Sequence, residues 1–492
     1  MLAARFSTHA SLSAISPRLS PAAASQLAQR ASLSHRHSHP ATGASVLHSA
    51  PLQGGVGMPF VRSIGRWAMT ALVINCIIGS GIYGLPSDLI HLLGRASPLA
   101  MIGVGLAMAT IMVSFAEVAS QFSGPGGSYL YVRTAFGRFA GLQVGWFWLL
   151  SVTSGAAASA NLFVTYLAAM LPQVGHGFLR ALVMTALIAV PVAANYFGAR
   201  SGAALSSVLT VAKLLPLVLL ILLGLARFSH HAALLPVPTI SGPAWKLWLS
   251  ASLLVFFPYG GYEDSIVPAG EVKDPRRTVP FALLTGLFSC IAVYTLIQFV
   301  TVVTIGAMPS ARPLGDVASV LVGRSGATFV EIAVMLSTYG YVSASILNAP
   351  RLASAFAAHG DCPAFFGELH PRFNTPALAI VLFASVVWVL ALTGTFRWAL
   401  VLSVASSTIY YAAVCATLIR LRRIRPQANA LRIPFGPLWA VLGIAISLAL
   451  LAQVGWLDIL LMGVTALIAA ANWWWAVHRP TAGDIAFNPE TP

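Results

Sequence analysis

Three small residues in an apolar segment, Gly79, Ser80 and Gly81, form the first candidate site of this 492-residue chain. They lie in the run Ile74–Pro86, inside an apolar stretch at about residues 67–93 that is long enough to cross a bilayer. Glycine forms helix poorly, so we expect the helix to break there. In lipid, a break persists only where its unpaired amides and carbonyls face protein or a polar ligand.

The chemistry of such a break depends on its backbone groups. The amides of Gly79, Ser80 and Gly81 would point at one spot and suit a carboxylate, as at a helix N-terminus. The carbonyls that end the first half, near Ile77 and Ile78, would receive an ammonium group. The pattern therefore fits a zwitterion, although small residues at this spacing also serve helix–helix packing.

A second apolar segment is interrupted by Pro258, Gly260 and Gly261, directly before the carboxylates Glu263 and Asp264. Proline and glycine in mid-membrane exclude an ordinary lipid-facing helix. The two carboxylates have two interpretations. They attract a cationic side chain of a substrate, or they act as gate or tether residues beside a neutral substrate.

Two further ionisable residues lie within apolar segments. Lys213, about ten residues into the fifth segment, either gains and loses a proton during a cycle or is a fixed ammonium that holds two helices together. Glu117, near the end of the second segment, is either tied to an arginine or backbone amide or acts at an inner gate. Four hydroxyl residues of the eighth segment either face the site or only pack: Ser337, Thr338, Ser343 and Ser345.

Composition excludes a water-soluble class, because 58% of the residues are hydrophobic and 8% are charged. We expect an all-α polytopic membrane protein with twelve transmembrane helices, the first and sixth of them broken. The apolar segments lie at about 67–92, 98–122, 140–171, 178–198, 203–226, 247–268, 280–305, 326–350, 376–395, 398–419, 436–454 and 456–477.

The charge distribution predicts the orientation. If both termini are cytoplasmic, the inner loops hold sixteen Lys and Arg residues and the outer loops seven. The formal net charge of +15 then reflects topology and lipid contact and not nucleic-acid binding. We expect an integral protein of the plasma (inner) membrane. The four cysteines show no CxxC spacing.

The N-terminal segment 1–57 contains no Asp or Glu and carries four Arg. It is either an organelle transit segment or an artefact of a start site placed upstream of Met58, and we expect it to be disordered. The corresponding positions of the two breaks predict a 5+5 inverted repeat (LeuT-like), typical of a secondary transporter with a mid-membrane site. The expected parts are a first repeat at 58–227, a second at 228–425, two extra helices at 426–479 and a tail at 480–492.

Together, these motifs resemble the amino acid–polyamine–organocation permeases over about residues 60–478. The matching runs are Ile-Ile-Gly-Ser-Gly-Ile at 77–82, Ala-Glu-Val-Ala-Ser through Pro-Gly-Gly-Ser-Tyr-Leu-Tyr at 116–131, Gly145-Trp146, Lys213-Leu-Leu-Pro, Phe-Phe-Pro-Tyr-Gly-Gly-Tyr-Glu at 256–263, Glu-Val-Lys-Asp-Pro-Arg-Arg at 271–277 and the loop 359–376.

The resemblance implies roles for several residues. It assigns the substrate carboxylate to the amides of residues 79–81, the amine to the carbonyls of residues 77 and 78, and a gate to Phe257. It places Lys213 where sodium-coupled relatives hold sodium, which implies proton-coupled symport or exchange and not coupling to sodium. The chain departs from the family pattern at Gly270, where an acidic residue is usual, and at Pro258.

We therefore expect a secondary active transporter of an amino acid or related amine, without cofactor or metal. A polyamine or cationic-amine permease is the alternative, and a non-transporting nutrient sensor is the alternative of another class. An enzyme is disfavoured because all twelve histidines lie in the N-terminal segment, in loops or at segment ends. No GxxxxGK[ST] loop for a nucleotide is present.

Overall fold

The computed structural model describes residues 64–122, 126–197, 202–230, 243–266, 272–306, 308–373, 375–424 and 431–478. The segments 1–57 and 480–492 therefore lie outside the described residues. Within these ranges the chain is helical, and its one β-type contact is an isolated bridge between Ile64 and Val272. The predicted all-α class is confirmed.

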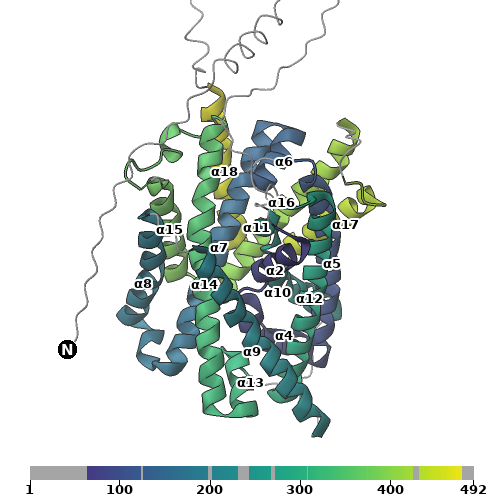
Figure 1. The fold of residues 1–492 in the computed structure, drawn as a ribbon, viewed down its shortest axis with the longest axis vertical. Helices are drawn as coiled ribbons and strands as arrows, with labels where there is room; N and C mark the ends of the chain where they lie inside the picture. Colours follow the sequence, from purple (N-terminus) through teal and green to yellow (C-terminus); the bar gives the residue numbers. More distant parts are fainter. Residues whose placement is uncertain are drawn as a thin grey trace, which may run out of the picture. The chain divides into compact units, whose positions relative to one another are not determined.

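Seven described helices are long and apolar enough to cross a membrane, which is the pattern of a polytopic membrane protein (Figure 1). Shorter apolar helices are present as well, partly because the helical breaks divide predicted spans. The seven are Pro86–Ala119, Arg138–Met170, Gly177–Tyr196, Arg277–Thr304, Arg324–Ala357, Phe396–Ile424 and Trp456–His478.

The α-helices follow one another along the chain as α2 (Arg66–Ile77), α3 (Gly81–Gly84), α4 (Pro86–Leu93), α5 (Ser97–Ala119), α6 (Gly127–Phe136), α7 (Arg138–Met170), α8 (Gly177–Tyr196), α9 (Gly202–His230), α10 (Ala244–Phe256), α11 (Tyr262–Ile266), α12 (Pro275–Thr304), α13 (Pro313–Val322), α14 (Arg324–Ala358), α15 (Ala377–Thr393), α16 (Phe396–Ile424), α17 (Gly436–Leu451) and α18 (Trp456–His478).

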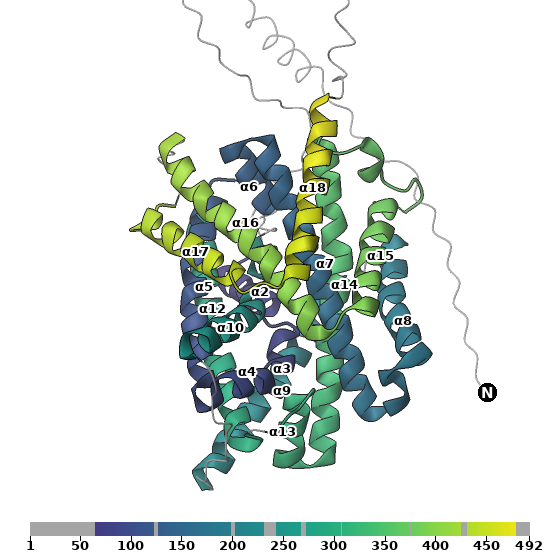
Figure 2. The same ribbon diagram turned by 180° about the vertical axis from the view of Figure 1, so that it is seen from behind.

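The long helix α7 forms the centre of the packing. Its middle is a run of small buried residues, Gly155 to Ala160, which lets α14 and α16 approach its backbone closely (Figure 2). A side-chain Cβ placed on Gly155 would lie 2.8 Å from the hydroxyl oxygen of Tyr341 on α14. On the other side, α12 packs against α2 and α5, while α18 covers the outside of α7.

A buried aspartate joins three separate parts of the chain. The Asp361 carboxylate accepts hydrogen bonds from the Tyr129 hydroxyl of α6 and the Arg138 guanidinium of α7, and Arg133 lies 3.2 Å away. Its backbone carbonyl accepts a bond of 2.6 Å from the Asn472 amide of α18. The loop after α14 is therefore fixed to α6, α7 and α18.

Candidate functional site

The first helix is interrupted between α2 and α3. Helix α2 ends at Ile77, and Ile78 takes an extended conformation with φ −74° and ψ 98°. Helix α3 begins at Gly81. No hydrogen bond found among the described residues has the amide of Gly79, Ser80 or Gly81 as its donor. The break thus leaves donors free at the position that the sequence indicates.

The second interruption follows α10. One turn of 3-10 helix, η3 (Phe257–Tyr259), connects α10 through Gly260 and Gly261 to the short helix α11. Gly261 has φ +86°, a conformation that favours glycine. A Cβ at Gly261 would also lie 2.7 Å from the Cys76 carbonyl oxygen, so this glycine permits close contact with α2.

The two breaks are in direct contact. A Cβ at Gly81 would lie 2.8 Å from Pro258 Cγ and 3.0 Å from Phe257 Cδ1. The buried hydroxyl of Tyr294 on α12 lies 3.1 Å from the carbonyl oxygens of both Ile77 and Pro258. The ends of the two interrupted helices therefore form one local structure, held by α12.

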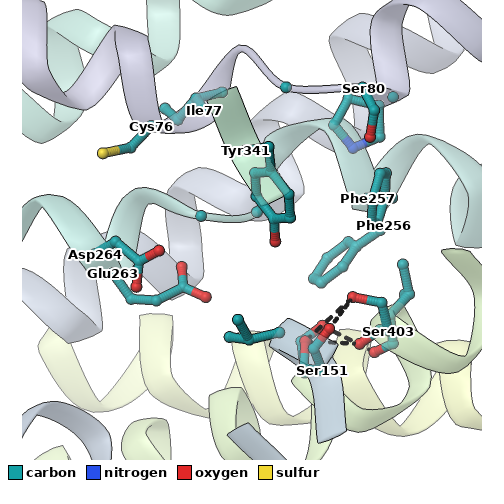
Figure 3. A pocket seen from close by; sticks show the side chains of 18 of the residues that line it. Cys76, Ile77, Ser80, Ser151, Phe256, Phe257, Glu263, Asp264, Tyr341 and Ser403 are labelled. Carbon is teal, nitrogen blue, oxygen red and sulfur yellow. Dashed lines mark hydrogen bonds between the residues drawn. The ribbon is translucent and has the colours of Figure 1, made fainter. Parts of the chain in front are cut away.

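A cavity of about 40 Å³ lies beside the two breaks (Figure 3). This volume holds water-sized molecules but is far below the roughly 300–1,000 Å³ of typical ligand pockets. Its walls come from both breaks and from α7, α14 and α16. The lining residues are Cys76, Ile77, Gly79, Ser80, Gly81, Ser151, Val152, Phe256, Phe257, Pro258, Gly260, Gly261, Glu263, Asp264, Tyr341, Ser403, Val404, Ser407, Tyr410 and Tyr411.

The carboxylates Glu263 and Asp264 lie on the opposite side of the view from Ser80 (Figure 3). Glu263 accepts a hydrogen bond of 2.6 Å from the Tyr410 hydroxyl and has the Tyr411 hydroxyl at 3.2 and 3.3 Å. Asp264 lines the same cavity, and among the described residues no side chain donates a hydrogen bond to its carboxylate. Glu263 thus has the contacts of a tether to α16.

Two serines from unbroken helices were missed by the sequence prediction. The Ser151 hydroxyl of α7 donates to the Ser403 carbonyl of α16 at 3.0 Å, and the Ser403 hydroxyl donates to the Ser151 carbonyl at 2.8 Å (Figure 3). The only sequence signal for Ser151 is its place just before the small-residue run of α7. This reciprocal pair joins α7 to α16 at the wall of the cavity.

On α14, the cavity is lined by Tyr341 and not by the four hydroxyl residues singled out in the sequence. Ser345 donates back to the Tyr341 carbonyl at 2.8 Å, and Thr338 donates to Val334 within its own helix at 2.9 Å. Ser337 and Ser343 do not line the cavity either. The packing interpretation fits all four, because the helical phase directs the Tyr341 ring to the site.

Lys213 contacts the first break from α9. Its side chain is 7% exposed, and its ammonium lies 3.4 Å from the Asn75 carbonyl oxygen of α2. The Tyr83 hydroxyl of α3 donates to the Lys213 carbonyl at 2.8 Å. Lys213 is therefore connected to both halves of the interrupted helix, although it does not line the cavity.

Besides Lys213, two more of the predicted site residues lie outside the cavity wall, Ile78 and Glu117. Ile78 is buried, and its amide donates to the Ile74 carbonyl at 2.9 Å. Glu117 is 1% exposed and pairs with the Arg422 guanidinium through bonds of 2.5 and 2.6 Å. The Ile433 amide donates to the same carboxylate at 2.9 Å. These contacts match the tie to an arginine and a backbone amide.

A bundle of apolar helices with two interrupted members meeting at a polar cavity defines an integral membrane protein of the transporter type. The family model described as "Amino acid permease" matches residues 64–477. The chain therefore belongs to the amino acid permease family.

Two similar proteins add detail. The chain is 26% identical over 426 residues to a protein named serine/threonine exchanger SteT from Bacillus subtilis (strain 168), which covers 84% of this chain and 95% of that protein. It is 27% identical over 368 residues to an uncharacterized transporter of Mycobacterium tuberculosis (strain ATCC 25618 / H37Rv), which covers 73% of this chain and 80% of that protein.

Proposed function

We propose that the chain is a secondary active transporter of amino acids or related amines that works by alternating access. The observation that carries this proposal is the contact between the two helix breaks at a single cavity, with free amides on one break and carboxylates on the other. Twelve spans, a 5+5 inverted repeat and two additional C-terminal helices belong to the same proposal. The site would lie between the two repeats.

In this proposal the substrate carboxylate binds the amides of Gly79, Ser80 and Gly81. Among the described residues these amides have no other acceptor, so a carboxylate would supply one. The substrate ammonium binds carbonyls at the end of α2, at Ile77 and Ile78. Phe257, which contacts Gly81, would act as a gate, with Gly260 and Gly261 shaping the opposite wall.

The cavity volume bears on the transport cycle. About 40 Å³ does not accommodate an amino acid, so Phe257 and Tyr341 must move before a substrate enters. We infer that this structure corresponds to a closed state of the cycle. Binding would then follow an opening of the site toward one side of the membrane.

The site favours a small neutral amino acid as the substrate. Glu263 is already bonded to Tyr410 and Tyr411, and Ser151 and Ser403 bring hydroxyl groups to the wall. A relative with 26% identity is named a serine/threonine exchanger, which agrees with this substrate class. Glu263 and Glu117 would act in gating through their ties to α16.

One observation favours the second candidate, a cationic-amine or polyamine permease. The Asp264 carboxylate lines the cavity, and no side-chain donor from the described residues bonds to it. A second positive charge on a substrate would supply that partner. A membrane sensor that binds the same ligand without carrying it is the alternative of another class.

Coupling to protons through Lys213 completes the proposal, since its ammonium contacts the first break. The protein would reside in the plasma (inner) membrane with both termini in the cytoplasm. The test measures uptake into proteoliposomes for a panel of labelled substrates: neutral amino acids, cationic amino acids and polyamines. Each is measured with an inward proton gradient, with a sodium gradient, and with substrate loaded inside.

Each outcome has a distinct meaning. Uptake of one substrate class driven by the proton gradient supports proton-coupled transport. Movement only with internal substrate identifies an exchanger. Saturable binding without movement under every condition contradicts transport and favours the sensor.

A further inference from the structure

A second hollow lies between α8 and α15, which run side by side in both views of the bundle (Figures 1 and 2). It is an apolar groove of about 410 Å³, with Ala189, Val192 and Ala193 on one wall and Val381 and Ala384 on the other. Ala193 and Val381 are exposed. The groove is separate from the cavity at the two breaks and from the proposed transport.

Three of the four polar side chains that line the groove are already bonded within the protein, those of Thr185, Ser385 and Trp388; the fourth is Tyr196. The Trp388 indole donates to the Thr185 hydroxyl at 2.9 Å, and that hydroxyl donates to the Ala181 carbonyl at 2.7 Å. The Ser385 hydroxyl donates to the Val381 carbonyl at 2.8 Å. Apart from Tyr196 at its end, the groove therefore offers a ligand no unpaired polar side chain, and a hydrocarbon chain is the occupant that the walls suit.

One end of the groove is different, because aromatic and basic residues gather there. Tyr196 and Phe197 line the groove, and their rings lie 5.5 Å from His370 and 5.2 Å from Phe373, respectively. The Arg372 guanidinium lies 5.5 Å from the centre of the Phe373 ring. We call these five residues the aromatic–basic cluster. Such clusters are typical of the depth of lipid headgroups.

Two donors of this cluster are available to an anion. Arg372 is exposed, and no carboxylate of the described residues forms an ion pair with it. The His370 Nδ1 atom accepts the Arg372 backbone amide at 3.2 Å, so the ring proton resides on Nε2. Together they present a positive charge and an N–H donor beside the apolar groove.

We propose that this groove is a binding site for an anionic phospholipid. One acyl chain lies between α8 and α15, and the phosphate is held by Arg372 and His370. Charge complementarity selects an anionic headgroup over a zwitterionic one, since the described cluster offers cationic and N–H groups and no carboxylate. The bilayer supplies this lipid, because the protein is integral to a membrane.

The test uses the full chain, purified and delipidated in detergent, and titrated with dioleoyl phosphatidylglycerol or dioleoyl phosphatidylcholine. Native mass spectrometry counts the bound lipids at each concentration. We expect phosphatidylglycerol to bind about fivefold tighter, the effect of one basic side chain at the headgroup. Arg372→Gln should bring the ratio of the two lipid affinities to about one. Arg351→Gln, at another exposed arginine, is the control and should leave this ratio unchanged.

The groove is tested separately. Ala193→Phe fills it and should weaken both lipids, and Ala194→Phe is the matched control, since Ala194 is exposed on α8 outside the groove. Equal binding of the two lipids to the unaltered protein overturns the proposal. An Ala193→Phe variant that binds both lipids as well as the unaltered protein also overturns it.

Discussion

The Lys213 ammonium lies 3.4 Å from the carbonyl oxygen of Asn75, on the last turn of α2 before the first break. The backbone of the same lysine accepts the Tyr83 hydroxyl at 2.8 Å, from beyond the break. One residue of α9 thus spans the interruption. A change in the charge of Lys213 would act directly on the geometry of residues 78–80.

The first prediction concerns coupling. Lys213→Ala removes the only group through which we expect a proton to act, so uptake should continue at a reduced rate with and without a pH gradient. The ratio of the two uptake rates should fall to about one. It is measured in proteoliposomes, with Lys273→Ala as control because Lys273 is exposed. A variant whose uptake still follows the pH gradient would exclude this role.

The second prediction concerns the carboxylate site. Gly81→Val should abolish substrate binding, because even a Cβ there approaches Pro258 to 2.8 Å and Phe257 to 3.0 Å. Gly103→Val is the matched control, since a Cβ at Gly103 meets no atom within 4 Å and this glycine lies outside the cavity wall. Binding is measured as the rise in the thermal unfolding midpoint of the purified protein when substrate is added. Unchanged affinity in a folded Gly81→Val variant would refute the site.

The third prediction separates neutral from cationic substrates. Glu263→Gln keeps a hydrogen-bond acceptor for Tyr410 but removes the charge. A neutral amino acid should retain its affinity within about threefold, whereas a substrate held by the Glu263 charge would lose about tenfold or more. Competition across a panel of substrates measures this, with the exposed Glu368→Gln as control. A large loss for neutral amino acids alone would contradict the tether.

The fourth prediction concerns stability. Arg422→Ala leaves the Glu117 carboxylate buried without its guanidinium partner, and removing one partner of a buried pair costs about 3 kcal/mol or more. The thermal unfolding midpoint should fall, while Arg423→Ala, at an exposed neighbour, should not change it. The double variant Glu117→Gln with Arg422→Met should regain part of the loss. Equal midpoints for Arg422→Ala and Arg423→Ala would show that the tie contributes nothing.

The fifth prediction concerns the loop after α14. Burial raises the pKa of the Cys362 thiol to about 11, and the neighbouring Asp361 charge adds to this effect. The reactive thiolate is therefore scarce at pH 7.5, and maleimide labelling should be slow. Labelling should accelerate only as the pH rises toward 11.

Opening of the loop should also expose this thiol. Asp361→Asn weakens the contacts to Arg138 and Arg133, so labelling at pH 7.5 should increase about tenfold or more. Cys362→Ser gives the background from other cysteines. Rapid labelling of the unaltered protein would contradict the buried environment.

The positions of the two breaks were predictable, because Gly-Ser-Gly and Pro-Tyr-Gly-Gly oppose helix wherever they occur. The residues that complete the cavity were not. Tyr341, Ser151 and Ser403 lie on unbroken helices, and their part in the cavity depends on helical phase and on close packing with α7. One sequence without packing information does not determine these.

Short helices in the connections were also missed. The apolar segments expected from the sequence end at about residue 122 and resume at about 140, yet between them Gly127–Phe136 is the helix α6. The helix α13 was likewise not expected. Both are brief, and α6 is held by tertiary contacts such as Tyr129 with Asp361, which local propensity does not encode. The loop after α14 contains a single 3-10 turn at Ala364–Phe366.

The Tyr294 hydroxyl has one proton and two carbonyl neighbours, Ile77 and Pro258, each at 3.1 Å. It can donate to only one of them at a time. While the proton serves one break, the other retains an acceptor, and an arriving ammonium group would find that oxygen without having to displace a bond. With an ammonium group on the Ile77 carbonyl, the tyrosine proton would stay on the Pro258 carbonyl, so that occupancy of one broken helix is reported to the other by the orientation of a single hydroxyl group.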